Sequence, residues 1–243
     1  MSILLIPVAP LSRTKSRLRD CFSIEKLKEF SLAMFKDLSR TLTKVNCFDY
    51  IITYCESSEI LELAANYGIV GIKEALTEPL KPFDDIICEF EKKVLDKYQI
   101  DQTVLAFLDL ILITPRNFIE FNELLKKNQL VMCPAIYSAG VSILGKNPPD
   151  IIQSSFSDPI IPSLVAFHTK ASKKGLDKIA IYDSFRAGYD VDIRQDLVVA
   201  YEYLKMFNLT HTDVFKFLKN NLKLSFKKKN ANNNRTFEIF EKK

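Results

Sequence analysis

Two charged segments of the chain have residue types that bind phosphate groups or a metal ion. Lys15 and Arg17 follow an apolar run at residues 3–8, and such side chains bind phosphate oxygens as point and forked charges. Asp109 lies inside a second apolar run, residues 104–113, where a carboxylate is costly unless it is paired, metal-bound or at a strand end. The alternatives are a solvated basic loop and a charge on an edge strand.

Asp190 and Asp192 form a third candidate group. They are alternate residues, so on an extended segment their carboxylates point the same way and could bind a divalent cation. An aspartate that precedes a helix is usually a cap, which makes this pair alone a weak indication. Combined with the basic loop and Asp109, the pair predicts a site for a metal-bound nucleotide.

Several other kinds of site are excluded by motifs that the chain lacks. Its six glycines form neither a G-x-G-x-x-G fingerprint nor a G-x-x-x-x-G-K-[ST] loop, which excludes the usual dinucleotide and P-loop sites. His168 and His211 lie far apart, and neither has a nucleophile in a recognisable motif near it. Five widely spaced cysteines argue against a zinc site and a disulfide framework, and we expect buried free thiols.

Length and composition are those of a globular protein. The 243 residues are 47% hydrophobic and 26% charged, and no run of about 18 apolar residues predicts a membrane span. The apolar N-terminal stretch is too short for a signal peptide and has no basic region before it, so we expect a cytoplasmic protein. Residues 205–243 carry ten lysines and arginines against three acids, but a short lysine run is usually a solvated face, and nucleic acid is not an expected partner.

The order of predicted elements indicates the fold class. Short β-branched runs alternate with amphipathic stretches, which is typical of βαβ units around a mostly parallel sheet. We expect a main domain at residues 1–208 and a basic extension, helix and hairpin, at residues 209–243. Ligands of such sheets bind at the carboxyl ends of the strands. The expected strands are residues 3–8, 50–54, 69–72, 103–108, 130–133, 141–144 and 179–182, with a terminal hairpin at 222–226 and 236–240. The expected helices are 24–42, one from 57 or 58 to 66, 82–97, 115–127, 161–174, 194–207 and 211–221.

A family resemblance rests on four segments, Ile6-Pro-Val8, Lys15-Ser-Arg-Leu18, Asp109 to Pro115 and, most specifically, Tyr182-Asp-Ser-Phe-Arg-Ala-Gly-Tyr-Asp-Val-Asp192 followed by Gln195-Asp-Leu197. Over about residues 1–229 the chain resembles the 2-phospho-L-lactate guanylyltransferase (CofC) family, archaeal type, within the molybdopterin-guanylyltransferase-like nucleotidyltransferases. The resemblance implies an α/β, Rossmann-like three-layer sandwich of the nucleotide-diphospho-sugar transferase type. It also implies transfer of GMP from GTP to 2-phospho-L-lactate or a related phosphorylated three-carbon acid, with release of pyrophosphate, in deazaflavin coenzyme biosynthesis.

The resemblance further implies a role for each candidate residue. Lys15, Arg17 and Asp109 would act in catalysis, and Asp109, Asp190 and Asp192 would hold Mg²⁺. GTP and a small phosphorylated acid are the implied partners, and a homodimer is favoured by the resemblance and by the apolar C-terminal helices. The residues implied in nucleotide or substrate binding are Pro7, Val8, Ala9, Lys15, Arg17, Leu80, Gly140 and Ser163.

Some positions depart from the family's pattern. Ala9 stands where a lysine is common, Lys81 follows Leu80 where the family has asparagine, and Ile111 replaces a proline. Bulkier side chains at residues 137–141 replace a Gly-Gly-Gly-Thr-Asn stretch. Two alternatives therefore stay open: an inactive paralogue that binds a nucleotide or a partner subunit as a scaffold, and an enzyme with a different acceptor.

Overall fold

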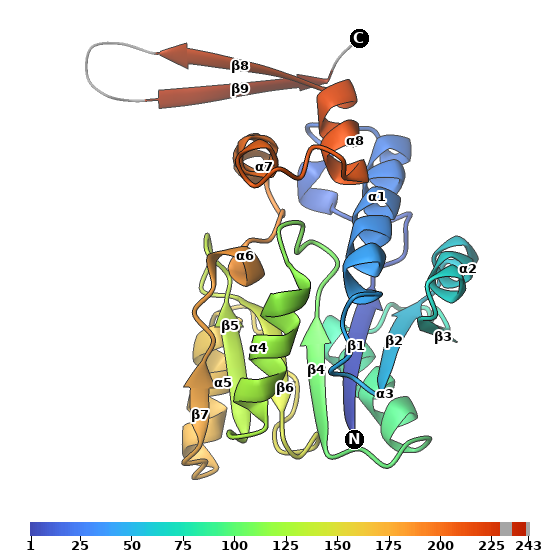
Figure 1. Ribbon diagram of the computed structural model, residues 1–243, viewed down its shortest axis with the longest axis vertical. Helices are drawn as coiled ribbons and strands as arrows, with labels where there is room; N and C mark the ends of the chain where they lie inside the picture. Colours follow the sequence, from blue (N-terminus) through green and yellow to red (C-terminus); the bar gives the residue numbers. More distant parts are fainter. Residues whose placement is uncertain (229–234, 242–243) are drawn as a thin grey trace.

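A seven-stranded sheet forms the centre of the protein (Figure 1). The computed structural model describes residues 1–228 and 235–241, with side chains up to Leu222. The strands are β1 (Ser2–Val8), β2 (Tyr50–Cys55), β3 (Val70–Lys73), β4 (Gln102–Ala106), β5 (Leu130–Pro134), β6 (Val141–Lys146) and β7 (Ile179–Ile181). They lie in the order β3-β2-β1-β4-β6-β5-β7, and every neighbouring pair is parallel except the two pairs that involve β6.

Helices cover both faces of this sheet, which confirms the predicted three-layer α/β fold (Figure 1). On one face lie α1 (Ile24–Leu42), α2 (Ser58–Asn66) and α4 (Pro115–Leu125), and on the other lie α3 (Phe83–Leu95) and α5 (Ser163–Lys173). Alternate residues of β1 enter the two cores, Leu4 on the α1 side and Leu5 on the α3 side. A strand buried on both faces is a continuous apolar run, and that pattern made β1 predictable.

Local capping fixes where the helices begin and end. Ser23 accepts a hydrogen bond from the Lys26 amide at the start of α1. Thr114 and Asn117 form a reciprocal capping box at the start of α4, where Pro115 occupies the first turn. Gly68 follows α2 with φ +72°, a backbone conformation that glycine adopts without strain. From these signals the sequence predicted the start of α1, the end of α2 and the start of α4 to within a residue or two.

The C-terminal elements gather beyond the carboxyl edge of the sheet (Figure 1). They are α6 (Phe185–Gly188), α7 (Arg194–Met206), α8 (Asp213–Asn221), β8 (Leu222–Lys228) and β9 (Arg235–Glu241), the last two paired antiparallel as predicted. The ring of Phe217 in α8 lies 5.0 Å from that of Phe30 in α1, and Asp37 of α1 accepts hydrogen bonds from the first amides of α8. Thus α8 is packed onto the main body, and a domain boundary at residue 208 stays a prediction. Part of the predicted asparagine-rich turn, residues 229–234, lies outside the described residues.

Two further expectations concern the membrane and the cysteines. Among the described residues, no helix combines the length and apolar character that a membrane crossing needs. All five cysteines are free thiols, as predicted, but Cys88 is exposed and Cys47 is only partly buried. The expectation of burial was wrong for Cys88 because it lies on a solvent-facing side of α3, whose buried residues are Ile87, Phe90 and Val94.

Candidate active site

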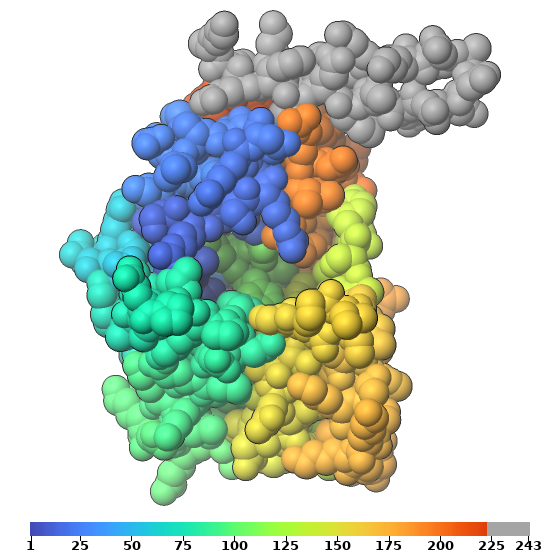
Figure 2. Space-filling model, turned by 180° about the vertical axis from the view of Figure 1, so that it is seen from behind, coloured from blue at the N-terminus to red at the C-terminus, as the bar shows by residue number. Residues whose placement is uncertain are grey.

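A cleft of about 360 Å³ opens where the order of the strands reverses. From β1 the chain continues to β2 on one side, and it later returns to β4 on the other side of β1, so the carboxyl ends of β1 and β4 border a crevice of the kind that binds ligands in such sheets. Figure 2 shows the hollow between the N-terminal segment in blue, residues near α3 in teal and the segment before α5 in yellow. The cleft is lined by Pro7, Ala9, Thr14, Lys15, Ser16, Arg17, Phe83, Phe107, Leu108, Asp109 and Asp192.

The basic loop after β1 directs Lys15 into this cleft. Lys15 has φ +47° and precedes a short 3₁₀ turn, Ser16–Leu18, in which Leu18 is buried. Its Nζ atom donates to Asp109 Oδ2 at 2.6 Å and to Asp192 Oδ1 at 3.0 Å. Arg17 is largely exposed, with a terminal nitrogen 3.4 Å from the second oxygen of Asp192. The predicted residues of the loop and both aspartates therefore meet in one place, and Lys15 is not a solvated side chain.

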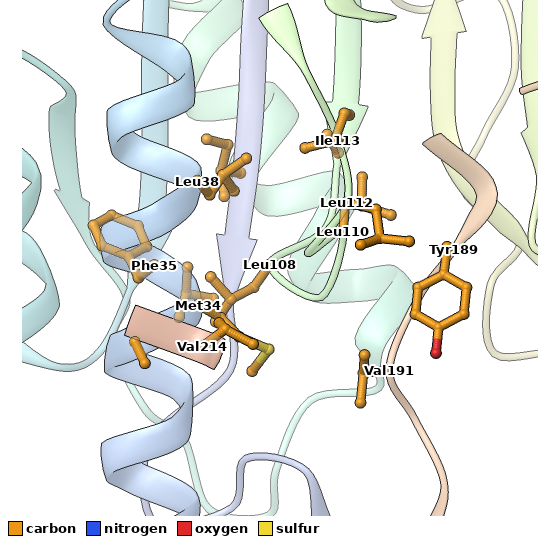
Figure 3. Close-up of a cluster of buried hydrophobic side chains, with 14 of the residues drawn as sticks. Met34, Phe35, Leu38, Leu108, Leu110, Leu112, Ile113, Tyr189, Val191 and Val214 are labelled. Atoms are coloured by element: carbon orange, nitrogen blue, oxygen red, sulfur yellow. The ribbon is translucent and has the colours of Figure 1, made fainter. Parts of the chain in front are cut away.

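Alternating burial aims Asp109 at Lys15. Leu108, Leu110 and Leu112 are buried in the core and, as Figure 3 shows, lie between α1 and the segment Tyr189–Val191. Asp109 lies between two of these leucines, three residues after the end of β4, and its side chain faces the cleft. Because β4 lies between β1 and β6 in the middle of the sheet, the alternative of an edge-strand charge is wrong.

A similar alternation places Asp190 and Asp192. Tyr189 and Val191 are fully buried, which leaves the two aspartates on the opposite side of an extended segment. The helix cap is made by another residue: the buried Asp196 carboxylate accepts hydrogen bonds from the amides of Asp192 and Ile193, both at 2.8 Å. The interpretation of Asp190 or Asp192 as the cap of α7 is therefore wrong, and Asp196 is the positioning residue that sequence analysis missed.

Burial and the charges of neighbouring side chains set the pKa values of the three aspartates. Burial, followed by the charges of Asp109 and Asp192, raises the pKa of Asp190 to about 7. Burial also raises the pKa of Asp109, although the Lys15 ammonium opposes this shift. For Asp192 burial acts in the same upward direction, but Lys15 and Arg17 outweigh it and lower the pKa. One ammonium group therefore neutralises two carboxylates, while the third is under pressure to take up a proton.

The donor set suits a hard divalent cation that is also bound by substrate. Within residues 1–222, no three histidine, cysteine or acidic side chains are arranged to hold a metal ion by themselves. Mg²⁺, however, is usually bound by one or two carboxylates together with water and substrate phosphates. Asp109 and Asp192 provide two such carboxylates in one cleft, and Asp190 is close enough for its pKa to respond to both. The metal role of the three aspartates stays a prediction.

The remaining predicted residues fall into three places. Pro7 and Ala9 line the cleft, whereas the Val8 side chain is buried in the α1-side core, so that only its backbone could contact a ligand. Leu80 lines a second, smaller pocket. Gly140 and Ser163 lie together beside β6, where Ser163 Oγ accepts from the Val141 amide at 3.0 Å, and neither lines the cleft. The structure thus brings Lys15, Arg17 and the aspartates together and leaves Leu80, Gly140 and Ser163 apart from them.

The aromatic wall of the cleft had no signal in the sequence. Phe83 at the start of α3 and Phe107 just after β4 have ring centroids 6.0 Å apart, and both rings line the cleft. Their partner Phe156 contacts both rings from the loop before α5. Because these residues come from three distant segments, only the sheet order brings them together.

The raised pKa of Asp190 makes a prediction for the metal-free protein. A carboxyl group whose pKa is near 3.8 when unfolded and about 7 when folded stabilises the fold below the lower value. That contribution is lost as the pH rises from about 4 to about 7. We therefore expect the melting temperature of Asp190→Asn, measured with a chelator present, to rise relative to that of the wild type by about 3 °C or more between pH 4.5 and pH 8. Melting curves that stay parallel over this range would contradict the shift.

A second prediction concerns the positioning role of Asp196. Asp196→Ala removes the acceptor of two backbone amides and should cost about 1–2 kcal/mol of stability. Because one of these amides belongs to Asp192, we also expect kcat to fall about 10- to 100-fold. Asp37→Ala is the matched control, since Asp37 accepts from two amides at the start of α8. Equal losses of stability with a loss of kcat only in Asp196→Ala support positioning; equal effects on kcat in both variants contradict it.

The cleft, the reversed strand order around it and the convergent lysine and carboxylates suit the binding of a metal-bound nucleotide on an α/β fold. The fold matches a protein assigned as a nucleotide-diphospho-sugar transferase from Desulfovibrio desulfuricans G20, with 14% identity, a TM-score of 0.70 and coverage of 90% of this chain and 94% of that chain. It also matches glucosyl-3-phosphoglycerate synthase from Mycobacterium tuberculosis in complex with Mn²⁺, uridine diphosphate and phosphoglyceric acid, with 13% identity, a TM-score of 0.53 and coverage of 99% and 87%.

Sequence comparison identifies the particular family. The family described as guanylyl transferase CofC like matches residues 1–240. A 2-phospho-L-lactate guanylyltransferase from Methanocaldococcus sp. (strain FS406-22) is 26% identical over 194 residues, which are 79% of this chain and 78% of that protein. The chain belongs to the CofC-like guanylyl transferases and is an enzyme of the nucleotidyltransferase class. The resemblance stated from the sequence is confirmed, and neither comparison favours an inactive scaffold.

Proposed function

We propose that the protein transfers GMP from GTP to 2-phospho-L-lactate, with release of pyrophosphate, as a step of coenzyme F420 biosynthesis. The relatives that carry this name support the reaction and the acceptor. The observation that carries the proposal is the position of Lys15 between Asp109 and Asp192 at the carboxyl ends of β1 and β4. A cation and several carboxylates in one cleft provide for both the phosphates and the counterion of a nucleotide.

The reaction requires charge neutralisation more than proton transfer. A phosphate oxygen of the acceptor attacks the α-phosphorus of GTP, a new phosphorus–oxygen bond forms, and the bond to the β-phosphate oxygen breaks so that pyrophosphate leaves with the electron pair. The attacking oxygen is already an anion and needs no general base, so positioning and electrostatic stabilisation supply the catalysis. Lys15 and Arg17 would hold the β and γ phosphates and stabilise the charge that develops on the leaving group.

The proposal includes a divalent cation. Asp109, with Asp190 or Asp192, would hold Mg²⁺, which when bound neutralises phosphate charge and polarises the reacting phosphoryl group. The Mn²⁺ in the solved structure of the mycobacterial synthase is a precedent for a divalent metal in a related fold. Gly140 and Ser163 would bind the acceptor. They lie beside β6, on the side of β4 away from β1.

Three finer features belong to the proposal as well. The Methanocaldococcus relatives support an archaeal type of enzyme. A homodimer and a cytoplasmic location are inferred from the family resemblance and remain to be tested by size-exclusion chromatography and by cell fractionation. Nucleic acid is not a proposed partner.

The test is pyrophosphate release from GTP with Mg²⁺ and 2-phospho-L-lactate, run beside phosphoenolpyruvate and beside ATP, CTP and UTP. Release that requires an acceptor and is greatest with 2-phospho-L-lactate and GTP supports the proposal. Release with another phosphorylated acid would instead identify a different acceptor. No release with any acceptor, together with no GTP-dependent thermal shift, would restore the scaffold alternative, because a ligand at 100 times its Kd stabilises a protein by about 2.7 kcal/mol.

A further inference from the structure

A second, smaller pocket of about 150 Å³ adjoins the phosphate side of the cleft. The loop after β1 borders both: Ala9 and Thr14 line the cleft, whereas Pro10 and Arg13 line the small pocket. The start of α3 is shared in the same way, with Phe83 in the cleft and Ile86 in the small pocket. A ligand could therefore extend from the cleft into the small pocket along this loop.

Glu74 contributes a carboxylate to the lining of the small pocket. It follows β3, its amide donates to the Cys55 carbonyl at 2.9 Å, and only 7% of the residue is exposed. Among the described residues its carboxylate has no hydrogen-bond or ion-pair partner, whereas nearby Glu89 is bound by Tyr54, Lys81 and Lys93. Because Glu74 lines the small pocket, its carboxylate is open to that pocket and can accept hydrogen bonds from a ligand there. Burial, followed by the charges of Glu89 and Glu56, raises the pKa of Glu74, although the charges of Lys81 and Lys93 oppose this shift.

We propose that Glu74 selects the guanine base by accepting hydrogen bonds from its N1–H and its 2-amino group, while Leu76, Leu80 and Ile86 contact the faces of the ring. This inference rests on the proposed function, in which the nucleotide is GTP. Guanine offers two adjacent donors that match the two oxygens of a carboxylate. Adenine and cytosine present a ring-nitrogen acceptor beside their single amino group, and uracil presents one N–H between two carbonyls, so each leaves an unfavourable contact with Glu74.

The position of the pocket agrees with the phosphate site. With the base against Glu74, the ribose and triphosphate would run past Pro10 and Arg13 toward Lys15 and Arg17, which border the cleft on the other side of the same loop. Leu80, which the family resemblance implies in nucleotide or substrate binding, would then contact the base and not the phosphates. This explains how Leu80 can serve the nucleotide although it lies apart from Lys15.

The experiment compares purine nucleotides that differ in the group at position 2. GTP has an amino group there, ITP has hydrogen and XTP has a carbonyl oxygen. In calorimetric titrations with Mg²⁺ and no acceptor, the wild type should bind GTP about 10- to 100-fold more tightly than XTP, and ITP should lie between them. Glu74→Gln should reverse the order, because the glutamine amide repels the amino group of GTP but donates to the carbonyl of XTP. Glu56→Gln is the matched control, since Glu56 is a neighbouring carboxylate that lines neither pocket, and it should keep the preference for GTP.

Several outcomes would overturn the inference. They are an unchanged order of affinities in Glu74→Gln, an equal loss for all three nucleotides, as expected if Glu74 binds the ribose or supports the fold, or equal affinities of the wild type for GTP and ITP. The last comparison uses no variant and so holds even if Glu74→Gln does not fold. GMP transfer by the wild type with an unchanged preference in Glu74→Gln refutes only this inference. A reversal of preference without transfer to any acceptor refutes only the proposed function.

Discussion

Replacing Asp109 with asparagine should lower the rate of GMP transfer by about 100- to 1,000-fold, with little change in stability. Asparagine keeps the shape of the side chain and removes its charge. The neighbouring leucines, Leu108 and Leu110, are buried and hold the backbone in place, so the amide should occupy the position of the carboxylate. What is lost is an anion in contact with Lys15 at 2.6 Å and a ligand for the proposed Mg²⁺. Pyrophosphate release with saturating GTP and 2-phospho-L-lactate measures the effect on kcat.

Two opposing effects, the relief of a desolvation cost and the loss of an ion pair, keep the stability of Asp109→Asn close to that of the wild type. Burial raises the pKa of Asp109, so removing the charge relieves a desolvation cost. The ion pair with Lys15 is lost, but Lys15 keeps Asp192 as a partner, and no buried charge is left alone. Asp101→Asn is the control, because Asp101 is an exposed carboxylate just before β4, at the end of β1 and β4 that lies away from the cleft. Asp109 has no role in the reaction if its asparagine variant retains more than a third of the activity of this control.

The fold was largely predictable because its signals are local. Buried strands such as β1 are continuous apolar runs, and caps such as Ser23 and Thr114 lie next to the helices that they begin. The general rule for open α/β sheets then places Lys15 and Asp109 at one edge. The antiparallel direction of β6 follows from its short connection to β5, which a hairpin can make and a parallel crossover cannot.

The rest of the site depends on contacts between segments that are distant in the sequence. The spacing of Asp190 and Asp192 singled them out in the sequence. That neither of them caps α7 could not be predicted, because the Asp196 carboxylate meets the Asp192 amide only in the folded turn. Glu74 is an ordinary acidic residue after a short strand, and nothing in the sequence shows that it lines a pocket. Phe83 and Phe107 meet only because α3 and β4 border the same cleft. For these residues the chemical types were visible and the distances were not.

Replacing Lys15 with glutamine should affect activity and stability together, in contrast to Asp109→Asn. Lys15 is the ammonium shared by Asp109 and Asp192, and its removal leaves the largely buried Asp109 carboxylate facing the partly exposed Asp192 carboxylate. Breaking a buried ion pair from one side costs about 3–5 kcal/mol. We therefore expect a lower melting temperature at pH 7.5 and a loss of kcat of about 100-fold or more, because the proposed ligand of the β and γ phosphates is gone. Lys15→Arg, which keeps the charge, should restore most of the stability.

The pH dependence distinguishes repulsion from a general loss of packing. Burial raises the pKa of Asp109 above its unfolded value, and Lys15 holds that shift in check, so the glutamine variant should raise it further. A carboxyl group with a raised folded pKa contributes stability below its unfolded value, near pH 4, and loses it as the pH rises. The deficit of Lys15→Gln in melting temperature, measured with a chelator, should accordingly be small at pH 4.5 and grow toward pH 7.5. Lys28→Gln, which removes an exposed lysine of α1, should show no such trend. A deficit in Lys15→Gln that is the same at both pH values would mean that Lys15 supports packing and does not neutralise the aspartates.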